Sequence, residues 1–348
     1  MLYRGSSPRP IINYISNNNS DPYWIKIGDM PENGYIVNSI KEHISVEGAK
    51  KSRRVYKGDM ILSNSMSFGK PYILNVDGYI HDGWFVIRNY ESSFERDYLR
   101  YLLASPTVQK RYSQIAAGGV VLNISSDLVN SVIVKIPSLN EQKEISSFLS
   151  ALDERIEIQN KIIDNLKSQI KSVSSRVYKL FSKTSKLSEL ISFEKKTNHK
   201  SEEGLKEGLY PFYTNEENQN KFFNSYDFDG QFILSNTGGR ANFKIVNGKF
   251  AVMSDTLVIK FKNPFLARTY INFLQNNTEK ISHNIFAGSG LKHLDKNAFL
   301  NINVPLIDND LSIINKLFET LDNKLINEKK YLSLLIIQKQ YLLNNLFI

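Results

Sequence analysis

The stretch IPSLNEQKEISSFLSALDERIEIQNKI, residues 136–162, decides how the rest of this chain is interpreted. It opens on an Ile-Pro pair, continues into charged residues and then follows a helical rhythm around a Leu-Asp pair. A second stretch, VPLIDNDLSIINKLFETLDNKLINEKK, residues 304–330, has the same plan, and Pro305 lies 168 positions after Pro137. The chain therefore carries one structural element twice, and the sequence around each copy should show what the duplication serves.

Each stretch predicts a long helix with one narrow apolar seam. In the first copy, apolar residues alternate at spacings of four and three over about five heptads, which is typical of a coiled coil. A helix from Glu141 to Phe181, capped by Asn140, would be ~60 Å long. An amphipathic helix packed on its own domain is the alternative, but this seam is longer and narrower than a small globule needs. The seam positions are Ile145, Leu149, Leu152, Ile156, Gln159, Ile163, Leu166, Ile170, Val173, Val177 and Leu180, then Ile314, Phe318, Leu321, Leu325, Glu328, Leu332 and Leu335.

One seam position in each helix is polar. Gln159 lies seven residues after Leu152, and Glu328 lies seven residues after Leu321, so the two residues occupy matching places. A polar residue at a single seam position fixes register and orientation and lowers stability. We interpret these two residues as a device that sets how the helices align.

The segments ahead of the two helices also repeat each other. Lys57–Arg88 and Asp229–Phe261 both predict a strand, a loop of small polar residues, a second strand, a turn with an Asp-containing loop, and a third strand. A short helix, a Gly-rich turn and an Asp-containing lead into the proline follow in the same order. Three pairs of strands match: Met60–Ser63 with Phe232–Ser235, Tyr72–Val76 with Phe243–Val246, and Trp84–Ile87 with Leu257–Phe261. The helix Glu95–Leu103 matches the helix Pro264–Leu274. Within the first strands, the four residues 61–64 align with residues 233–236.

This order predicts an internal duplication of a mixed α/β globule followed by a long helix. The predicted fold class is α+β, with two similar domains and two long coiled-coil helices. The predicted boundaries are 1–136 for the first domain, 137–183 for the central helix, 184–303 for the second domain and 304–348 for the C-terminal helix.

Composition narrows the class of protein. The 348 residues include no cysteine, which excludes disulfides and thiolate metal sites and fits a cytoplasmic location. The N-terminal MLYRGSSPRP has no apolar signal region, and no run approaches ~18 apolar residues, so no membrane partner is expected. The net charge of +9 favours a polyanionic partner, with nucleic acid first, over a basic housekeeping protein.

Three motifs carry a resemblance to a known family. The segment IPSLNEQKEISSFLSALDERIEIQNKIIDNLK, residues 136–167, closely resembles the central region of specificity subunits of type I restriction-modification systems (HsdS). RGSSPRP with WIKIGDM, residues 4–10 and 24–30, resembles the start of the family's first target recognition domain, and LSELISFEKK, residues 187–196, resembles the start of the second. Two features depart from the family pattern: Asp308-Asn309-Asp310 replaces the second Glu-Gln signature, and the first domain nearly lacks the apolar lead-in of residues 187–193.

The resemblance implies a non-catalytic DNA-recognition subunit. It implies two target recognition domains at opposite ends of two antiparallel helices, with pseudo-twofold symmetry, and each domain reading one half of a split site in double-stranded DNA. It also implies partners that hold the chemistry: two methylation subunits that use S-adenosylmethionine, and restriction subunits that use ATP and Mg²⁺. No cofactor or metal is expected in this chain. A rod with one reader per domain also suits half-sites roughly one duplex turn, ~34 Å, apart.

Polar and basic loops are the candidate DNA-binding segments. Base readout needs hydrogen-bonding side chains that reach the major groove, and phosphate contacts need Lys, Arg or bare backbone N–H groups. The loops after the first predicted strand of each copy fit, although an ordinary hairpin turn is the alternative, and a Lys-Arg cluster fits a phosphate clamp. The candidates are Lys50, Lys51, Arg53, Arg54, Asn64, Ser65, Ser67, Lys70, Gly118, Gly119, Asn236, Thr237, Gly238, Arg240, Asn242, Ser289, Lys292 and His293. We predict that His81-Asp82 closes a turn and that Trp84 is a core residue.

Catalytic motifs are not apparent. Asp21-Pro22-Tyr23-Trp24 lacks the second proline of an amino-methyltransferase motif, and Gly69-Lys70-Pro71 lacks the flanking residues of a P-loop. The five histidines are scattered and form no zinc-like pattern. Three alternatives to a working DNA-recognition subunit stay open: a coiled-coil adaptor without DNA selectivity, a silent specificity allele, and a self-sufficient DNA-modifying enzyme.

Overall fold

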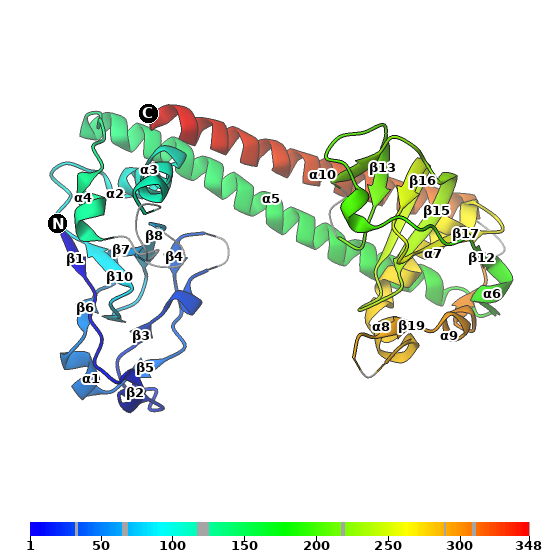
Figure 1. Ribbon diagram of the computed structural model, residues 1–348, viewed down its shortest axis with the longest axis horizontal. Coiled ribbons are helices and arrows are strands. Elements are labelled where there is room, and N and C mark those ends of the chain that lie inside the picture. Colours follow the sequence, from blue (N-terminus) through cyan, green and yellow to red (C-terminus); the bar gives the residue numbers. More distant parts are fainter. Residues whose placement is uncertain are drawn as a thin grey trace. The chain divides into compact units, whose positions relative to one another are not determined.

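The computed structural model divides the chain into two compact units (Figure 1). Unit 1 comprises residues 1–158 and 332–348, and unit 2 comprises residues 159–331. Each unit holds a β-sheet, helices packed on one face of that sheet, and a portion of each long helix, so the predicted α+β class is confirmed. The structure describes residues 1–31, 34–64, 69–116, 125–216, 220–288, 290–307 and 311–347.

Unit 1 is built on a five-stranded sheet of order β1-β10-β7-β8-β4, antiparallel except for the pair β4 and β8. Side chains alternate across it, as the strand period of two requires. Met60 and Leu62 pack against the helices, while Ile61 packs with Trp84 on the opposite face. The elements are β1 (Leu2–Arg4), β2 (Ile15–Ser16), β3 (Trp24–Ile25), β4 (Ile36–Val37), β5 (His43–Ile44), α1 (Val46–Lys50), β6 (Arg53–Val55), β7 (Met60–Ser63), β8 (Pro71–Leu74), β9 (Gly78–Ile80), β10 (Trp84–Ile87), α2 (Arg96–Ala104), α3 (Pro106–Ala116) and α4 (Ser126–Ser131).

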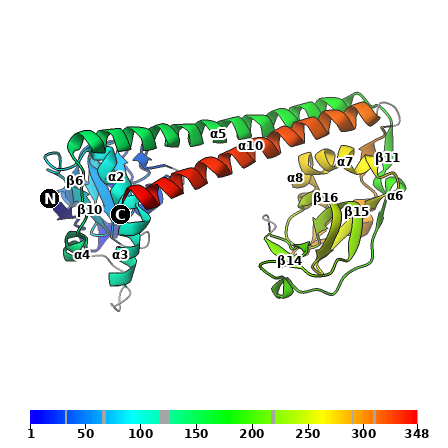
Figure 2. The ribbon, with the colours of Figure 1, turned by 90° about the horizontal axis from the view of Figure 1, so that it is seen from above.

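Unit 2 is built on a six-stranded sheet of order β12-β17-β15-β16-β13-β14. Helix α7 packs on one face, where Tyr270 and Leu274 join Ile233 and Ile259 in a single core (Figure 2). Leu234 faces the other way, into a smaller aromatic cluster. The elements are β11 (Thr184–Lys186), α6 (Leu187–Leu190), β12 (Ile191–Phe193), β13 (Tyr210–Tyr213), β14 (Lys221–Phe223), β15 (Phe228–Asn236), β16 (Phe243–Val252), β17 (Thr256–Phe261), α7 (Phe265–Asn276), α8 (Thr278–Ile285), β18 (Phe286–Ala287), β19 (His293–Leu294), α9 (Lys296–Leu300) and β20 (Asn303–Pro305).

The predicted match between the two copies is one residue out of register. The sequence aligns Ile61 with Ile233, and the strands around them form as predicted. However, Ile61 lies on the face away from the helices, whereas Ile233 lies on the face against them. A slip of one residue moves every side chain of a strand to the other face. The correspondence of the quartets 61–64 and 233–236 is therefore wrong.

Two long helices, α5 (Leu139–Lys179) and α10 (Leu311–Leu346), contain 41 and 36 residues. Within unit 2 they run antiparallel, because Gln159 meets Glu328 at one end of the shared seam and Tyr178 meets Phe318 at the other. Helix α5 begins two residues earlier than predicted, so the expected cap at Asn140 is wrong. Ser138 is the cap: its hydroxyl accepts from the Glu141 N–H at 3.4 Å, and the Glu141 carboxylate accepts from the Ser138 N–H at 3.0 Å.

The polar seam residues bond to each other. Gln159 is 4% exposed, and its Nε2 donates to the Glu328 carboxylate at 2.6 Å and to the Glu328 carbonyl at 3.1 Å. We expect Gln159→Leu to lower the free energy of unfolding by about 1–3 kcal/mol, because the half-buried carboxylate then loses its donor. Adding Glu328→Leu should restore the loss, since two leucines complete the apolar seam. Urea unfolding of both single variants and the double variant measures this coupling, and additive effects would contradict it.

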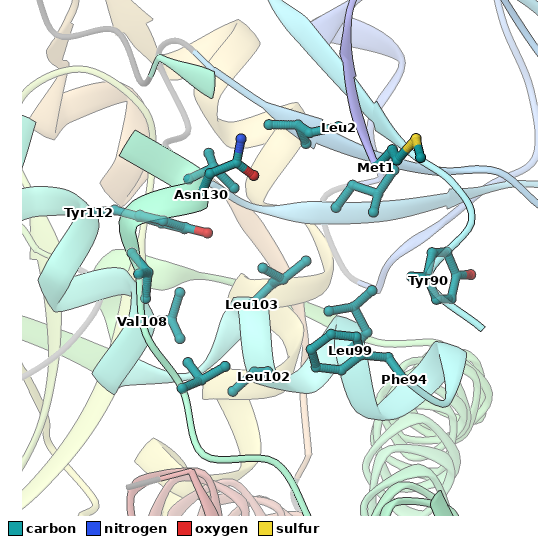
Figure 3. A pocket seen from close by; sticks show the side chains of 14 residues that line it. Met1, Leu2, Tyr90, Phe94, Leu99, Leu102, Leu103, Val108, Tyr112 and Asn130 are labelled. Carbon is teal, nitrogen blue, oxygen red and sulfur yellow. The ribbon is translucent and has the colours of Figure 1, made fainter. Parts of the chain in front are cut away.

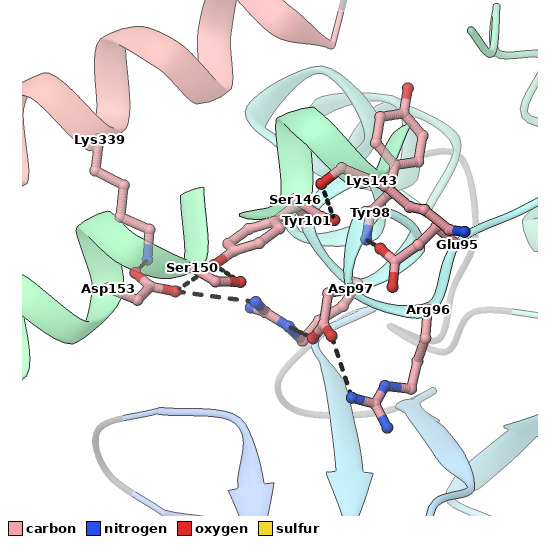
Figure 4. Close-up of polar contacts among 11 residues, drawn as sticks. Glu95, Arg96, Asp97, Tyr98, Tyr101, Lys143, Ser146, Ser150, Asp153 and Lys339 are labelled. Carbon is pink, nitrogen blue, oxygen red and sulfur yellow. Dashed lines mark hydrogen bonds and ion pairs between the residues drawn. The ribbon is translucent and has the colours of Figure 1, made fainter. Parts of the chain in front are cut away.

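At the Asp of each Leu-Asp pair, a helix that packs on the sheet forms an ion pair with a long helix. In unit 1, Arg100 of α2 reaches Asp153 of α5 at 3.9 Å and Asp97 at 3.3 Å (Figure 4). In unit 2, Arg268 of α7 binds Asp322 of α10 at 2.6 Å. Burial raises the pKa of Asp322, and the Arg268 guanidinium opposes that rise. The repeated Leu-Asp signature therefore marks an ion pair between domain and helix in each unit.

Among the described residues, no helix is both long enough and apolar enough to span a bilayer.

Candidate nucleic-acid interface

Two of the candidate segments meet in unit 2. The segment from the last residue of β15 through the loop that follows, residues 236–242, lies against β19, the strand that contains His293. Gly239 N–H donates to the Lys292 carbonyl at 2.8 Å, Leu294 N–H donates to the Thr237 carbonyl at 2.9 Å, and Gly238 bridges His293. Gly239 has a φ of +80°, which favours glycine at this turn. Segments more than fifty residues apart thus form one ridge, named here the unit 2 loop ridge, residues 236–242 with 291–294.

Half-buried polar side chains hold this ridge in shape. Asn236 Nδ2 donates to the Gly238 carbonyl at 2.7 Å and also to the Arg240 carbonyl. Thr237 is fixed from the other side, because its N–H and its hydroxyl both donate to the Asp255 carbonyl at 3.0 Å. Asn236 and Thr237 therefore determine the course of the loop. The side chains of the ridge that are available to a ligand are the exposed ones, Arg240, Lys292 and His293.

Two cations project from the ridge. Arg240 and Lys292 are both exposed, and neither side chain has a hydrogen-bond or ion-pair partner within the described residues. A guanidinium can donate two parallel hydrogen bonds to guanine or to phosphate, and an ammonium binds phosphate as a point charge. His293 is exposed beside them. The arrangement can hold an anionic, hydrogen-bonding ligand such as the edge of a duplex.

A small polar cavity lies under the base of this loop. Its lining includes Asn215, Asn236, Asn242 and Thr256. Asn236 Oδ1 and Thr256 Oγ1 are buried and find no hydrogen-bond partner in the part of the chain that the structure describes. Buried polar atoms need a partner, so a water molecule or a ligand group is expected here. Thr256 was not among the residues predicted from the sequence, because its place in the cavity depends on the pairing of β17 with β15.

The equivalent loop of unit 1 is only partly described. Asn64 is 3% exposed, and its amide donates to the Asp82 carbonyl at 2.7 Å, so this side chain shapes the loop from within. Lys70 is exposed, with its Nζ 5.1 Å from the centre of the Tyr72 ring. The predicted residues Ser65, Ser67, Gly118 and Gly119, and Ser289 in unit 2, lie outside the described residues.

The basic cluster of unit 1 does not form a single patch. Arg53 and Arg54 are neighbours on β6, so their side chains lie on opposite faces of that strand. Arg53 lies over Tyr3 and donates to the Arg4 carbonyl at 3.1 Å, whereas Arg54 lies over Tyr56. Lys51 donates to the Tyr14 hydroxyl at 2.7 Å, and Lys50 is exposed at the end of α1. The geometry therefore does not favour a clamp in which Lys50, Lys51, Arg53 and Arg54 all contact one phosphate group.

A second polar group in unit 1 was largely missed from the sequence. Asp82 accepts from the Ser7 hydroxyl at 3.1 Å and from the Arg9 guanidinium at 2.7 Å, beside a groove that Lys26 and Trp24 also line. Although burial raises the pKa of Asp82, these two donors bring it below its ordinary value. His81 Nδ1 accepts from the Gly83 N–H at 2.9 Å, so the predicted turn is confirmed, as is the buried Trp84. The signal available was the RGSSPRP motif, whose Ser7 and Arg9 bind this turn.

Comparison with known proteins gives one family and several related folds. The family model described as "Type I restriction modification DNA specificity domain" matches residues 8–168 and again 182–335. The crystal structure of a type I restriction-modification system S subunit from M. genitalium is 18% identical, with a TM-score of 0.60, over 100% of this chain and 93% of that one. A structure described as the basis of complex assembly and conformational transition of the type I R-M system is 13% identical, with a TM-score of 0.58, over 99% and 96% of the two chains. At these identities the two structures support the fold.

Proposed function

The chain belongs to the family of type I restriction-modification DNA specificity subunits, and from this membership we propose that each of its two domains reads one half of a split DNA target. Members of this family recognise DNA through two target recognition domains, and catalysis belongs to other subunits of the complex. The proposal for this chain assigns residues 1–136 and 184–303 to the two readers and residues 137–183 and 304–348 to the helices between them.

One observation supports the proposal most strongly: the unit 2 loop ridge exposes Arg240 and Lys292 on a backbone that hydrogen bonds from Asn236 and Thr237 hold in place. A reader needs donors whose positions are fixed before DNA arrives, because ordering them on binding reduces affinity. We assign base reading to Arg240, with Asn242 behind it, and phosphate contact to Lys292 and His293. In unit 1, we assign the corresponding DNA contacts to Lys70 and to the face of β6 that carries Arg53.

The proposed partners supply the chemistry. Two methylation subunits, one per half of the molecule, bind the outer faces of the long helices and use S-adenosylmethionine, and restriction subunits join through the complex and use ATP and Mg²⁺. This chain itself holds no cofactor in the proposal, and it acts in the cytoplasm without a membrane partner. The predicted contact residues on the helices are Glu154, Arg155, Glu157, Lys161, Lys167, Asn323, Lys324 and Lys329. Ile158, Ile326 and Leu334 are also more than 45% exposed on these helices, so the contact is expected to be partly apolar.

The test of the whole proposal is methylome sequencing of cells that express this chain with its cognate methylation subunit. A new split motif, with a methylated adenine in each half, is the expected result. The control is the same strain without the chain. A soluble complex that adds no methylation anywhere would contradict the proposal and favour a scaffold or a silent allele.

Arg240→Ala should weaken binding of the cognate duplex by about 1–3 kcal/mol, because a bidentate contact to a base is lost. Arg240→Lys should recover only part of this, since an ammonium cannot donate in the same parallel geometry. Lys292→Ala should instead weaken cognate and random duplexes alike and flatten the salt dependence. Fluorescence anisotropy at two salt concentrations measures these effects, with Lys206→Ala as an exposed control. Unchanged selectivity in Arg240→Ala would remove this residue from the reader and favour a coiled-coil adaptor.

A further inference from the structure

Two hollows of unit 1 differ in their chemistry. The pocket beside α2 is lined by apolar side chains such as Leu99 and Val108, and the described residues that line it include no charged side chain (Figure 3). The other hollow does have charged side chains on its lining, so it suits a ligand that accepts or donates hydrogen bonds. It is named here the Asp82 groove, residues 7–11, Trp24, Lys26, His81 and Asp82.

A glycine near the N-terminus fixes the path of the chain into this groove. Gly5 N–H donates to the Trp84 carbonyl at 2.8 Å. A Cβ atom at Gly5 would lie 1.9 Å from the His81 carbonyl oxygen, so only glycine allows this close approach. The RGSSPRP motif is therefore held against the turn that contains Asp82.

Arg9 is held at one edge of its guanidinium. Its Nη2 donates to Asp82 Oδ2 at 2.7 Å, and the Ser7 hydroxyl donates to Asp82 Oδ1 at 3.1 Å. Pro8 and Pro10 flank Arg9 and restrict the backbone on both sides of it. The Arg9 side chain is 78% exposed, and its other N–H groups have no partner among the described residues. The guanidinium is therefore oriented, while most of its donors are available to a ligand.

Carboxylates compensate the cations of the groove. Asp82 pairs with Arg9, and Glu42 pairs with Lys26. Burial lowers the pKa of His81, although Asp82 opposes this, so the imidazole is uncharged at neutral pH. A phosphate near Arg9 would meet the carboxylate of Asp82, whereas O6 and N7 of guanine are uncharged acceptors that a guanidinium binds with two hydrogen bonds. The groove therefore favours base reading over phosphate contact.

Arg9 also lies close to the DNA contacts that are assigned to unit 1. Arg53 Nε donates to the Arg4 carbonyl at 3.1 Å, and Arg4 Nε donates to the Asp82 carbonyl at 3.3 Å. The same carbonyl accepts from the Asn64 amide at 2.7 Å. A duplex bound at Arg53 would therefore pass close to the Asp82 groove.

We propose that Arg9 reads a guanine in the half-site of unit 1, with Asp82 and Ser7 as positioning residues that orient its guanidinium toward O6 and N7. The inference rests on the proposed function, because it requires that unit 1 reads one half of the DNA target. It adds to that function the residue that reads and the base that is read.

The test uses the complex of this chain with its methylation subunit and the motif recovered by methylome sequencing. The half read by unit 1 is the one that stays unchanged when residues 184–303 are exchanged, and it should contain a G·C pair. Arg9→Ala should relax that position alone and weaken binding of the cognate duplex about tenfold, without changing the salt dependence. Arg9→Lys should recover only part of this loss. Arg96→Ala is the matched control, because it removes another exposed arginine that pairs with an aspartate, and it should leave motif and affinity unchanged.

A base analogue and a change at Asp82 identify the contact. Guanine replaced by 7-deazaguanine at the relaxed position should weaken binding to the original chain about fivefold and should not affect binding to Arg9→Ala. Asp82→Asn should lower discrimination at this position about threefold, since an uncharged partner holds Arg9 less firmly. It should bind random duplexes at least as tightly as the original chain, because a negative charge is lost. An ion pair with a structural role alone would change neither quantity.

The outcomes separate this inference from the proposed function. An unchanged motif in Arg9→Ala, or equal weakening for cognate and random duplexes, would overturn Arg9 as the reader while the proposed function stands. Unchanged discrimination in Asp82→Asn would overturn the positioning role of Asp82. The absence of any motif for the original chain would overturn the inference and the proposed function together. Melting temperatures of the Arg9 variants should lie within about 2 °C of the original chain, because an exposed ion pair contributes little to stability.

Discussion

Exchanging residues 184–303 for the second recognition domain of another family member should change one half of the DNA target completely and leave the other half and the spacing unchanged. The expectation follows from the two units, each of which has its own sheet, core and loops. The long helices stay those of the recipient, so the distance between readers should not change. Methylome sequencing of the exchanged chain with its methylation subunit measures both halves at once.

The place of the junction offers a sharper version of this experiment. An exchange of 184–303 separates Ser185 of the donor from Val304 of the recipient, although these residues are paired across β11 and β20. An exchange of 184–305 moves the whole pair together, so it should give the same new half-site with a more stable protein. A change in both halves, or in neither, would contradict the assignment of one reader to each domain.

Arg100→Ala should be among the most destabilising single substitutions in unit 1. Arg100 is 4% exposed, and its guanidinium carbon lies 3.4 and 3.7 Å from the centres of the Tyr35 and Tyr101 rings. Asp97 and Asp153 are its carboxylate partners. Its removal leaves Asp97 with the exposed Arg96 and Asp153 with Lys339, and it empties the space between the two tyrosine rings, so we expect a loss of about 3 kcal/mol in the free energy of unfolding.

Arg96→Ala is the matched control for this substitution. Arg96 lies on the same helix and also pairs with Asp97, but its side chain is 52% exposed, so its loss should cost less than ~1 kcal/mol. Denaturant unfolding of the three proteins, followed by tryptophan fluorescence of the unit 1 core, provides the comparison. Equal losses for Arg100→Ala and Arg96→Ala would show that burial of the cluster contributes nothing.

The helices and most strands of this fold could be predicted from the sequence because their signals are local. Apolar spacing placed α5 within two residues of its bounds, and short apolar runs bounded by turn residues placed β7 and β10. The strand register failed for a physical reason. Ile61 and Ile233 sit in strands that are apolar on both faces, so the pattern does not say which face meets the helices. Shifting the alignment of the two strands by one residue then leaves the number of matched apolar positions unchanged.

The candidate site was predictable as a set of loops but not as a geometry. The meeting of Gly238 with His293 depends on pairing between distant segments, and nothing near either residue signals it. The partners of the Leu-Asp pairs were missed for the same reason, because Arg268 is 54 positions from Asp322. Asn64 was predicted to reach toward DNA, yet its side-chain amide donates to the Asp82 carbonyl, and the side chain is buried within unit 1. Residue type indicated the chemistry, and tertiary pairing decided which side chains are available for it.

The bond between Gln159 and Glu328 has a consequence for assembly. Helices with long apolar seams can also associate between molecules, and two copies of α10 aligned on their seams would bring two Glu328 carboxylates together. Like charges in a seam oppose such pairing, whereas the glutamine of α5 satisfies the same carboxylate. The seam thus disfavours the pairing of α10 with another copy of α10 and favours its pairing with α5. The Gln159–Glu328 pair therefore contributes to correct helix pairing as the chain folds.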